Sequence, residues 1–407
     1  MATQLEAFPD HLKIEDFVYQ PEIRTVQLYP ITGNPWQSQL LPPVILKDGK
    51  LLLTFDKLTD QMERLAVKII NCTADWQISH LSPVEYLQTY NEFFITDRQL
   101  SFNTKVNFVH YRFEVPPVQL SGNYLLVVYE EGNEENLFLS RRFMVYEPLA
   151  GINAVVKNPV GVEESFRNQQ IDFTISYGNL PVITPQQIRV MVRQNFRWDN
   201  MQRDWQPSFV RAYEKVLQFD NFMPERHFKG GNEFRSFNIS NLNTPLFNVA
   251  QINLHPHVNK VFIAADQSRN GWAYNRLFAD QNGRFVIATV QGNRDSGTEA
   301  DYAEVVFTLK SPPLQEGKVF VTGSFSDWRL EEPYQMKYYP DEQAYRCVLL
   351  LKQGIYDYQY SVLRHNGMRD DALLEGNHGQ TQNTYEIFVY FRPFGARSDF
   401  LVGYKML

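Results

Sequence analysis

Two groups of residues in this sequence are best suited to chemistry. One is a pair of histidines, and the other is a group of three carboxylates further along the chain. His255 and His257 flank a proline and come nearest to a pair of metal ligands, but they have no clustered partner. Asp370, Asp371 and the nearby Glu375 could act as paired carboxylates in glycoside hydrolysis. That reaction needs two carboxyl groups that face each other across a cleft, whereas adjacent aspartates in a turn are usually solvated. We therefore interpret the histidine segment as a loop and the carboxylate segment as a solvated turn.

Catalytic and cofactor-binding motifs of defined spacing are absent from the sequence. It has no Gly-x-Ser-x-Gly nucleophile elbow, no phosphate-binding Gly-rich loop and no His-Glu-x-x-His helix. Cys72 and Cys347 lie far apart, which excludes a disulfide framework and a cysteine-rich metal site. We therefore predict a protein that is not an enzyme, with no catalytic, cofactor-binding or metal-binding residue, no cofactor and no small-molecule ligand.

Charge and composition limit the class of protein further. The 39 Lys and Arg residues against 46 Asp and Glu give a net charge of -7, which argues against nucleic acid as a partner. Apolar runs such as 124–129 and 347–351 are far shorter than the roughly 20 residues of a membrane-spanning helix, so we expect no transmembrane segment. The length of 407 residues suggests two to three domains, and the 14% aromatic content favours strands.

Short apolar segments separated by turn residues follow one another along the whole chain. They predict an all-β fold of three consecutive immunoglobulin-like β-sandwich domains, at 1–149, 150–298 and 299–407. A proline and a glycine mark the first boundary, and we interpret the polar segment 291–300 as the second linker. The middle domain contains a long loop, 196–231, whose many aromatic residues indicate that it packs on its own domain.

The most distinctive polar and aromatic residues lie in and beside this loop. Two interpretations stay open: a partner-binding loop, or an internal network of hydrogen bonds and ion pairs around a tight glycine turn. The candidate partner-binding residues are Trp198, Asp199, Asn200, Asn232, Glu233 and Arg235.

The last third of the chain resembles the immunoglobulin-like E-set sandwich of starch- and glycogen-binding modules. The resemblance rests on the segment 319–328, which ends Gly-Ser-Phe-Ser-Asp-Trp, and on Gly-Ile-Tyr-Asp-Tyr-Gln-Tyr at 354–360. It implies a glycan site at Trp328 and Asn383, with Gln359 where those modules have a lysine and no second tryptophan near 366–368. The alternative is that Trp328 only closes its turn over the core.

A second set of motifs spans the whole chain in one order. It includes Asn-Cys-Thr-Ala-Asp-Trp at 71–76, Ser-Gly-Asn-Tyr at 121–124, Arg-Arg-Phe-Met at 141–144, Gln-Asn-Phe-Arg-Trp-Asp-Asn at 194–200, Gly-Gly-Asn-Glu-Phe-Arg at 230–235 and Tyr-Phe-Arg-Pro-Phe-Gly at 390–395. By these motifs the chain resembles the type IX secretion system plug protein family of Bacteroidetes.

This resemblance implies a function and a location. It implies a plug subunit that binds and closes the periplasmic opening of the outer-membrane translocon barrel. It also implies a periplasmic location, and since the first residues lack a signal peptide we expect this to be the mature chain. The alternative functions are a glycan-binding protein that uses the C-terminal module and, more remotely, a cytosolic glucan-associated scaffold.

Overall fold

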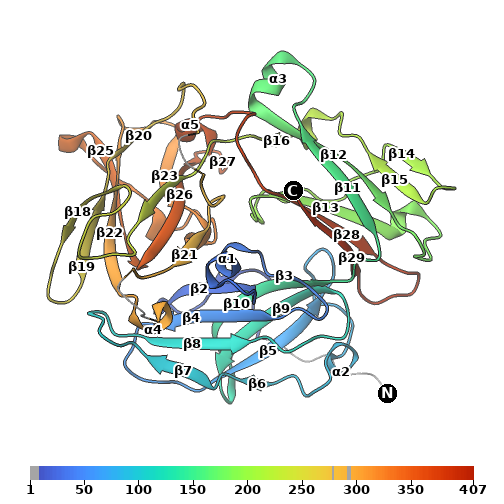
Figure 1. The fold of residues 1–407 in the computed structure, drawn as a ribbon, viewed down its shortest axis with the longest axis horizontal. Coiled ribbons are helices and arrows are strands. Elements are labelled where there is room, and N and C mark those ends of the chain that lie inside the picture. Colours follow the sequence, from blue (N-terminus) through green and yellow to red (C-terminus); the bar gives the residue numbers. More distant parts are fainter. Residues whose placement is uncertain (1–8, 277–278, 291–294) are drawn as a thin grey trace.

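The short apolar segments form strands throughout the computed structural model, which describes residues 9–276, 279–290 and 295–407 (Figure 1). The described residues form six sheets that pack in pairs, and the fold is nearly all β, as the sequence predicted. The helices of the described residues are short, with at most six residues each. Within the described residues, none of these helices has the length and apolar character needed to cross a membrane.

The first sandwich comprises residues 17–146. One sheet contains, in spatial order, β1 (Phe17–Val18), β10 (Asn133–Tyr146), β9 (Gly122–Glu130), β5 (Leu65–Cys72) and β6 (Phe93–Phe94), with β3 (Val44–Leu46) parallel to β10. The other contains β2 (Ile23–Pro30), β4 (Leu51–Lys57), β8 (Val109–Glu114) and β7 (Asp97–Leu100). The helices α1 (Pro35–Leu40) and α2 (Pro83–Tyr86) lie in its connections.

The second sandwich draws its strands from two separate stretches of the chain. One sheet contains β11 (Gly151–Lys157), β12 (Asn168–Ser176), β15 (Val216–Phe219) and β14 (Phe209–Arg211), with β16 (Phe228–Lys229) also paired to β12. The other contains β13 (Ile188–Gln194), β28 (Tyr385–Phe391) and β29 (Phe400–Met406). Helix α3 (Val162–Arg167) joins β11 to β12. The predicted loop 196–231 thus contains three strands of its own, and all three belong to the first of these sheets.

The third sandwich lies between these two stretches, over residues 235–375. One sheet contains β17 (Arg235–Asn238), β26 (Gly354–Arg364) and β21 (Phe285–Ile287), with β23 (Gly317–Thr322) and β27 (Arg369–Asp370) also paired to β26. The other contains β18 (Val249–Asn253), β19 (Asn259–Ile263), β22 (Tyr302–Lys310), β25 (Ala344–Lys352) and β24 (Lys337–Tyr339), with β20 (Asp266–Gln267) beside β22. Helices α4 (Ser296–Glu299) and α5 (Ala372–Glu375) flank these sheets.

The strand pairing corrects the predicted domain order. The predicted domains 150–298 and 299–407 are not consecutive units, because β13 pairs along its whole length with β28 and because β17 and β21 pair with β26. The third sandwich is inserted into the second. Of the predicted linker 291–300, residues 291–294 lie outside the described residues, and 296–299 form α4. Apolar periodicity shows that a strand exists but not which distant strand it pairs with.

The sheet β13–β28–β29 is buried on both faces. Ile387 and Val389 point into the core of the second sandwich, whereas Phe388, Tyr390 and Met191 pack on the outer face of β5 and β9 in the first sandwich. A buried apolar interface therefore fixes the second sandwich on the first.

A buried ionic cluster fixes the third sandwich on the first. Asp56 of β4 accepts hydrogen bonds from Lys352 Nζ and Tyr302 Oη of the third sandwich, each at 2.6 Å, and lies 2.6 Å from His110 Nδ1. Burial acts to raise the pKa of the Asp56 carboxyl, but the Lys352 charge and the contacts with His110 hold it below its usual value. Asp56 is fully buried, so its charge depends on these partners.

Candidate functional site: a cavity at the junction of the three sandwiches

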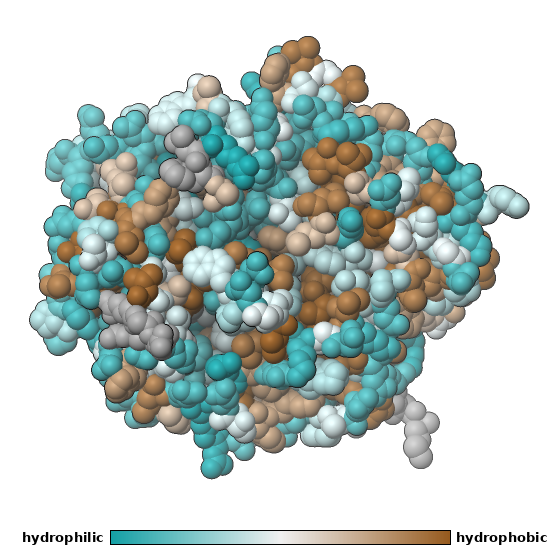
Figure 2. Space-filling view, viewed as in Figure 1, coloured by the Kyte–Doolittle hydropathy of each residue, from teal (hydrophilic) through white to brown (hydrophobic). Residues whose placement is uncertain are grey.

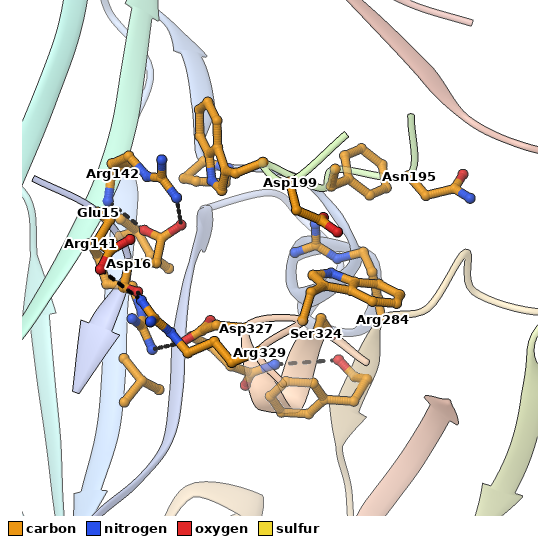
Figure 3. A pocket seen from close by; sticks show the side chains of 18 of the residues that line it. Glu15, Asp16, Arg141, Arg142, Asn195, Asp199, Arg284, Ser324, Asp327 and Arg329 are labelled. Carbon is orange, nitrogen blue, oxygen red and sulfur yellow. Dashed lines mark hydrogen bonds and ion pairs between the residues drawn. The ribbon is translucent and has the colours of Figure 1, made fainter. Parts of the chain in front are cut away.

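A cavity of about 540 Å³ lies where the three sandwiches meet, and we call it the junction cavity. Its walls are rich in arginine, and their acidic residues gather mainly on the side of the first sandwich (Figure 3). The charged residues that line it are Glu15 and Asp16 just before β1, Arg141 and Arg142 from the first sandwich, Arg193 and Asp199 from the second, and Arg284, Asp327, Arg329 and Arg369 from the third.

Trp198, in the turn that follows β13, is the aromatic centre of one wall. Its ring packs edge-to-face on Trp76 of the first sandwich, with 5.1 Å between ring centroids. The guanidinium carbons of Arg142 and Arg193 lie 4.0 and 4.2 Å from the centroid of the Trp198 ring. Two cation–π contacts therefore hold this predicted residue between the first and second sandwiches.

Arg193 also forms a buried ion pair across the β13–β28 register. Its Nε and Nη2 atoms donate to the Glu386 carboxylate at 2.5 and 2.9 Å, and both side chains are shielded from solvent. Burial acts to lower the pKa of Arg193, but the Glu386 carboxylate outweighs burial and raises it. Arg193 therefore lines the cavity with its charge already compensated by Glu386.

Asp199 belongs to a four-membered ionic network that links the second and third sandwiches. Arg197 contacts Asp199 at 2.6 Å and Asp371 at 2.8 Å, and Arg369 contacts the same two carboxylates at 3.3 and 2.7 Å. These arginines outweigh burial and lower the pKa of both carboxyls. Asp371 is therefore an ion-pair partner of Arg197 and Arg369, which it shares with Asp199.

The other members of the acidic turn have structural partners as well. Asp370 pairs with Arg364 at 2.6 Å and accepts the first backbone N–H groups of α5. Glu375 is buried, pairs with Arg235 and Arg269, and accepts the backbone N–H of Tyr360. These contacts correct the interpretation of a solvated turn, because Glu375 is 3% exposed and all three carboxylates are held by arginines.

Four of the six candidate partner-binding residues lie outside the junction cavity and form internal hydrogen bonds. Asn200 exchanges hydrogen bonds with the backbone of Gln194, and Asn232 donates to the carbonyl of Glu375. Glu233 accepts hydrogen bonds from Tyr274 Oη and the Gln382 backbone, and Arg235 bridges Glu375 and Asp266. Only Trp198 and Asp199 of the predicted set line the cavity.

The three residues of the glycan interpretation do not form an accessible platform. Trp328 lines the cavity, but its side chain is enclosed by the Phe234 ring and the Arg197 guanidinium, and the residue is 8% exposed. Gln359 is buried, and Asn383 donates to Gln169 Oε1 and the Gly230 carbonyl in the second sandwich. Sugar stacking needs an open ring face, so this structure does not offer the platform that the resemblance implied.

The histidine pair lies on the loop between β18 and β19. The backbone carbonyl of His255 accepts a hydrogen bond from Lys105 Nζ at 2.6 Å, which ties this loop to the first sandwich. Among the described residues, no group of three or more His, Cys, Asp or Glu side chains is arranged to hold a metal ion.

Replacing Trp198 with alanine should lower the free energy of unfolding by about 2 kcal/mol, because the ring is half-buried and a fully buried tryptophan contributes about 3–5 kcal/mol. The loss combines apolar burial with the contacts to Arg142 and Arg193. Urea unfolding followed by circular dichroism measures the change. Trp272, which is 57% exposed, is the matched control, and W272A should change the stability by less than about 0.5 kcal/mol. Equal effects of W198A and W272A would contradict the assigned packing.

The chain is similar to a known family and to a solved structure. Residues 23–147, which span nearly all of the first sandwich, match the family model of the type 9 secretion system plug protein 1st domain. A hypothetical protein from Parabacteroides merdae ATCC 43184 has 32% sequence identity and a TM-score of 0.90, over 97% of this chain and 99% of that chain. No curated protein matches. The first sandwich therefore carries the type 9 secretion system plug protein 1st domain, over residues 23–147 of the chain.

Proposed function

We propose that this protein is a non-enzymatic plug subunit that binds the periplasmic opening of the outer-membrane translocon of the type IX secretion system and closes it. The match of residues 23–147 to the plug domain carries this proposal. It includes a periplasmic location, because the opening to be closed faces the periplasm. A pore wide enough for folded cargo leaks small solutes unless a body of comparable size covers it.

The way the sandwiches are joined supports the proposal. A plug has to resist deformation, and an apolar interface and a buried ionic cluster fix the second and third sandwiches on the first. A stable contact with the barrel should bury about 1,200–2,000 Å². The surface of the chain offers apolar side chains for such a contact. Figure 2 shows apolar residues around α3, where Val160, Val162 and Phe166 are exposed.

Affinity purification of the tagged protein from detergent-solubilised outer membranes tests the proposal. We expect the translocon barrel to co-purify when secretion is idle, and cells that lack the protein to admit a large hydrophilic dye. Because exposed apolar patches mark protein contacts, V162D together with F166D should reduce recovery of the barrel. The control is V84D on α2, where the side chain is 78% exposed, compared with 75% for Val162.

The two results address different parts of the proposal. Failure to recover the barrel with the unmodified protein in any secretion state would overturn the plug function. Recovery with V162D and F166D at the level of V84D would instead exclude the α3 surface and leave the plug function standing.

A further inference from the structure

We infer that the junction cavity is a binding site for a carboxylate-bearing ligand with an apolar or aromatic flank, and that Arg284 receives the carboxylate. This site is independent of contact with the translocon. Arg284 lies just before β21 of the third sandwich and lines the cavity with residues from all three sandwiches.

Arg284 differs from the other arginines of the cavity walls in its partners. Arg141, Arg142 and Arg329 pair with Asp327, Asp16 and Glu15, each at 3.2 Å, and Arg193 and Arg369 pair with Glu386 and Asp371. Arg284 forms no ion pair with any described residue. Its Nη2 donates only to the backbone carbonyls of Gln39 at 3.2 Å and Leu41 at 2.9 Å, in and just after α1.

The surroundings of Arg284 leave its charge under-compensated. Its Nε atom is shielded from solvent and has no hydrogen-bond partner among the described residues. Burial lowers the pKa of Arg284 to about 10; the nearby Arg193 acts in the same direction, and Glu386 only partly opposes it. A buried donor without a partner is costly, and an anion placed against this guanidinium would supply both the partner and the charge.

The shape and chemistry of the walls indicate the class of anion. Hydrogen bonds from a guanidinium to a carboxylate are strengthened by the two charges, and Nη1 of Arg284, unlike Nη2, has no hydrogen-bond partner among the described residues. The Phe196 ring lies under Arg284, with the guanidinium carbon 4.9 Å from its centroid, and Trp198, Phe285 and Trp328 supply further apolar wall. The volume of about 540 Å³ falls within the range of small-ligand sites. These features fit an organic carboxylate with an apolar part better than a free inorganic anion.

Backbone conformation adds a second, independent observation. Two pairs of cavity residues have positive φ: Asn195 at 52° with Phe196 at 61°, and Asp327 at 48° with Trp328 at 60°. Aromatic residues rarely adopt this conformation, and it persists only where the surroundings enforce it. Asn195 is held by Thr384, whose backbone N–H donates to Asn195 Oδ1 at 2.9 Å, and Arg369 donates to the Trp328 carbonyl at 2.6 Å. The chain thus holds Phe196 and Trp328 against the cavity despite the strain, as expected of pre-organised walls.

The test uses the full-length protein and two ligands that differ only in charge. N-acetylphenylalanine carries the free carboxylate, and N-acetylphenylalaninamide is its neutral match. Calorimetric titration should give at least about tenfold tighter binding of the carboxylate, and only the carboxylate should raise Tm. Succinate, as a second arm, carries carboxylates without an aromatic flank, so it should bind more weakly than N-acetylphenylalanine. Succinate binding as tight as that of N-acetylphenylalanine would show that the site takes any organic acid and would overturn the apolar flank.

Variants assign the binding to Arg284. R284M should weaken carboxylate binding by about tenfold or more. R284K should retain part of it, because lysine keeps the charge and loses the planar fork. R211M is the matched control, because Arg211 lies exposed on β14 and pairs only with Glu214 and Gln218. Equal binding of the acid and the amide by the unmodified protein, or no binding of either, would overturn the inference even if R284M fails to fold. Unchanged carboxylate binding in a folded R284M would overturn it as well.

Discussion

Replacing Lys352 with methionine should lower the free energy of unfolding by about 3–5 kcal/mol, which makes it one of the most damaging single substitutions in the chain. Lys352 Nζ lies 2.6 Å from Asp56 Oδ2, and both side chains are almost completely buried. Methionine fills a similar volume, so little of the loss comes from packing. The cost arises because the Asp56 carboxylate stays buried without its principal counter-charge. Urea unfolding monitored by tryptophan fluorescence at neutral pH measures the loss.

A surface ion pair provides the control for this prediction. Lys50 Nζ contacts Glu114 at 2.7 Å, close to the separation of the buried pair, but these side chains are 66% and 52% exposed. K50M should therefore cost less than about 1 kcal/mol. In the double variant D56L/K352M neither buried charge remains, so it should be at least as stable as K352M. A loss below about 1 kcal/mol for K352M would show that Asp56 is not the buried charge that the structure describes.

The position of this cluster connects stability with the proposed function. Asp56 and His110 belong to the first sandwich, whereas Tyr302 and Lys352 belong to the third. Loss of Lys352 should therefore loosen the docking of two sandwiches rather than the core of either one. If the plug acts as a single rigid body, K352M should also reduce co-purification of the translocon at temperatures where each sandwich is still folded.

The strands of this protein were predictable because their signal is local. Ile171, Phe173 and Ile175 alternate with polar residues in the sequence, and all three point into the core of the second sandwich. The order of the domains was not predictable from such local patterns, because it depends on which distant strands pair with each other. Apart from Glu386, the residues of β28 are apolar on both faces, so they do not indicate a partner strand. The partner is β13, and the paired residues Arg193 and Glu386 are 193 positions apart.

The junction cavity was predictable only in part, because most of its residues are brought together by contacts between distant parts of the chain. Trp198 and Asp199 stood out because aromatic and charged residues cluster around them in the sequence. Arg284 gave no such signal, because it stands alone between a glycine and the start of an ordinary short strand. The fold places Arg284 in the cavity wall and against the Gln39 carbonyl, 245 positions away in the chain. Sequence alone marks residues of unusual type, whereas a site assembled from three domains depends on contacts that only the fold creates.

Asp357 is a buried carboxyl whose environment makes the stability of the third sandwich depend on pH. It is fully buried on β26 and accepts hydrogen bonds from Ser236 Oγ and from the backbone N–H groups of Gln281 and Gly283, the last at 3.2 Å. Burial, and then the nearby charge of Asp280, raise the pKa of Asp357 from 3.8 to about 7. At pH 5 the folded protein therefore keeps this carboxyl protonated, whereas the unfolded chain ionises it.

The sign of the pH effect follows from that difference. A raised folded-state pKa stabilises the protein fully below pH 3.8, and this stabilisation is lost as the pH rises toward 7. At about 1.4 kcal/mol per pKa unit, the loss across this window is on the order of 4 kcal/mol. D357N should abolish it, because asparagine stays neutral and its amide can still accept from the backbone and donate to Ser236 Oγ. Relative to the unmodified protein, D357N should be markedly more stable at pH 8 and nearly equal at pH 4.

The exposed Asp60 provides the matched control, because D60N makes the same chemical change at the surface. Urea unfolding at several values between pH 4 and pH 8 compares the three proteins, and D60N should follow the unmodified protein throughout. Asp280 contributes in the same sense, since burial raises its pKa to about 6, so D357N should flatten the curve without making it level. If D357N instead loses stability at pH 8, then Asp357 is ionised in the native state and the backbone hydrogen bonds, rather than burial, control its charge.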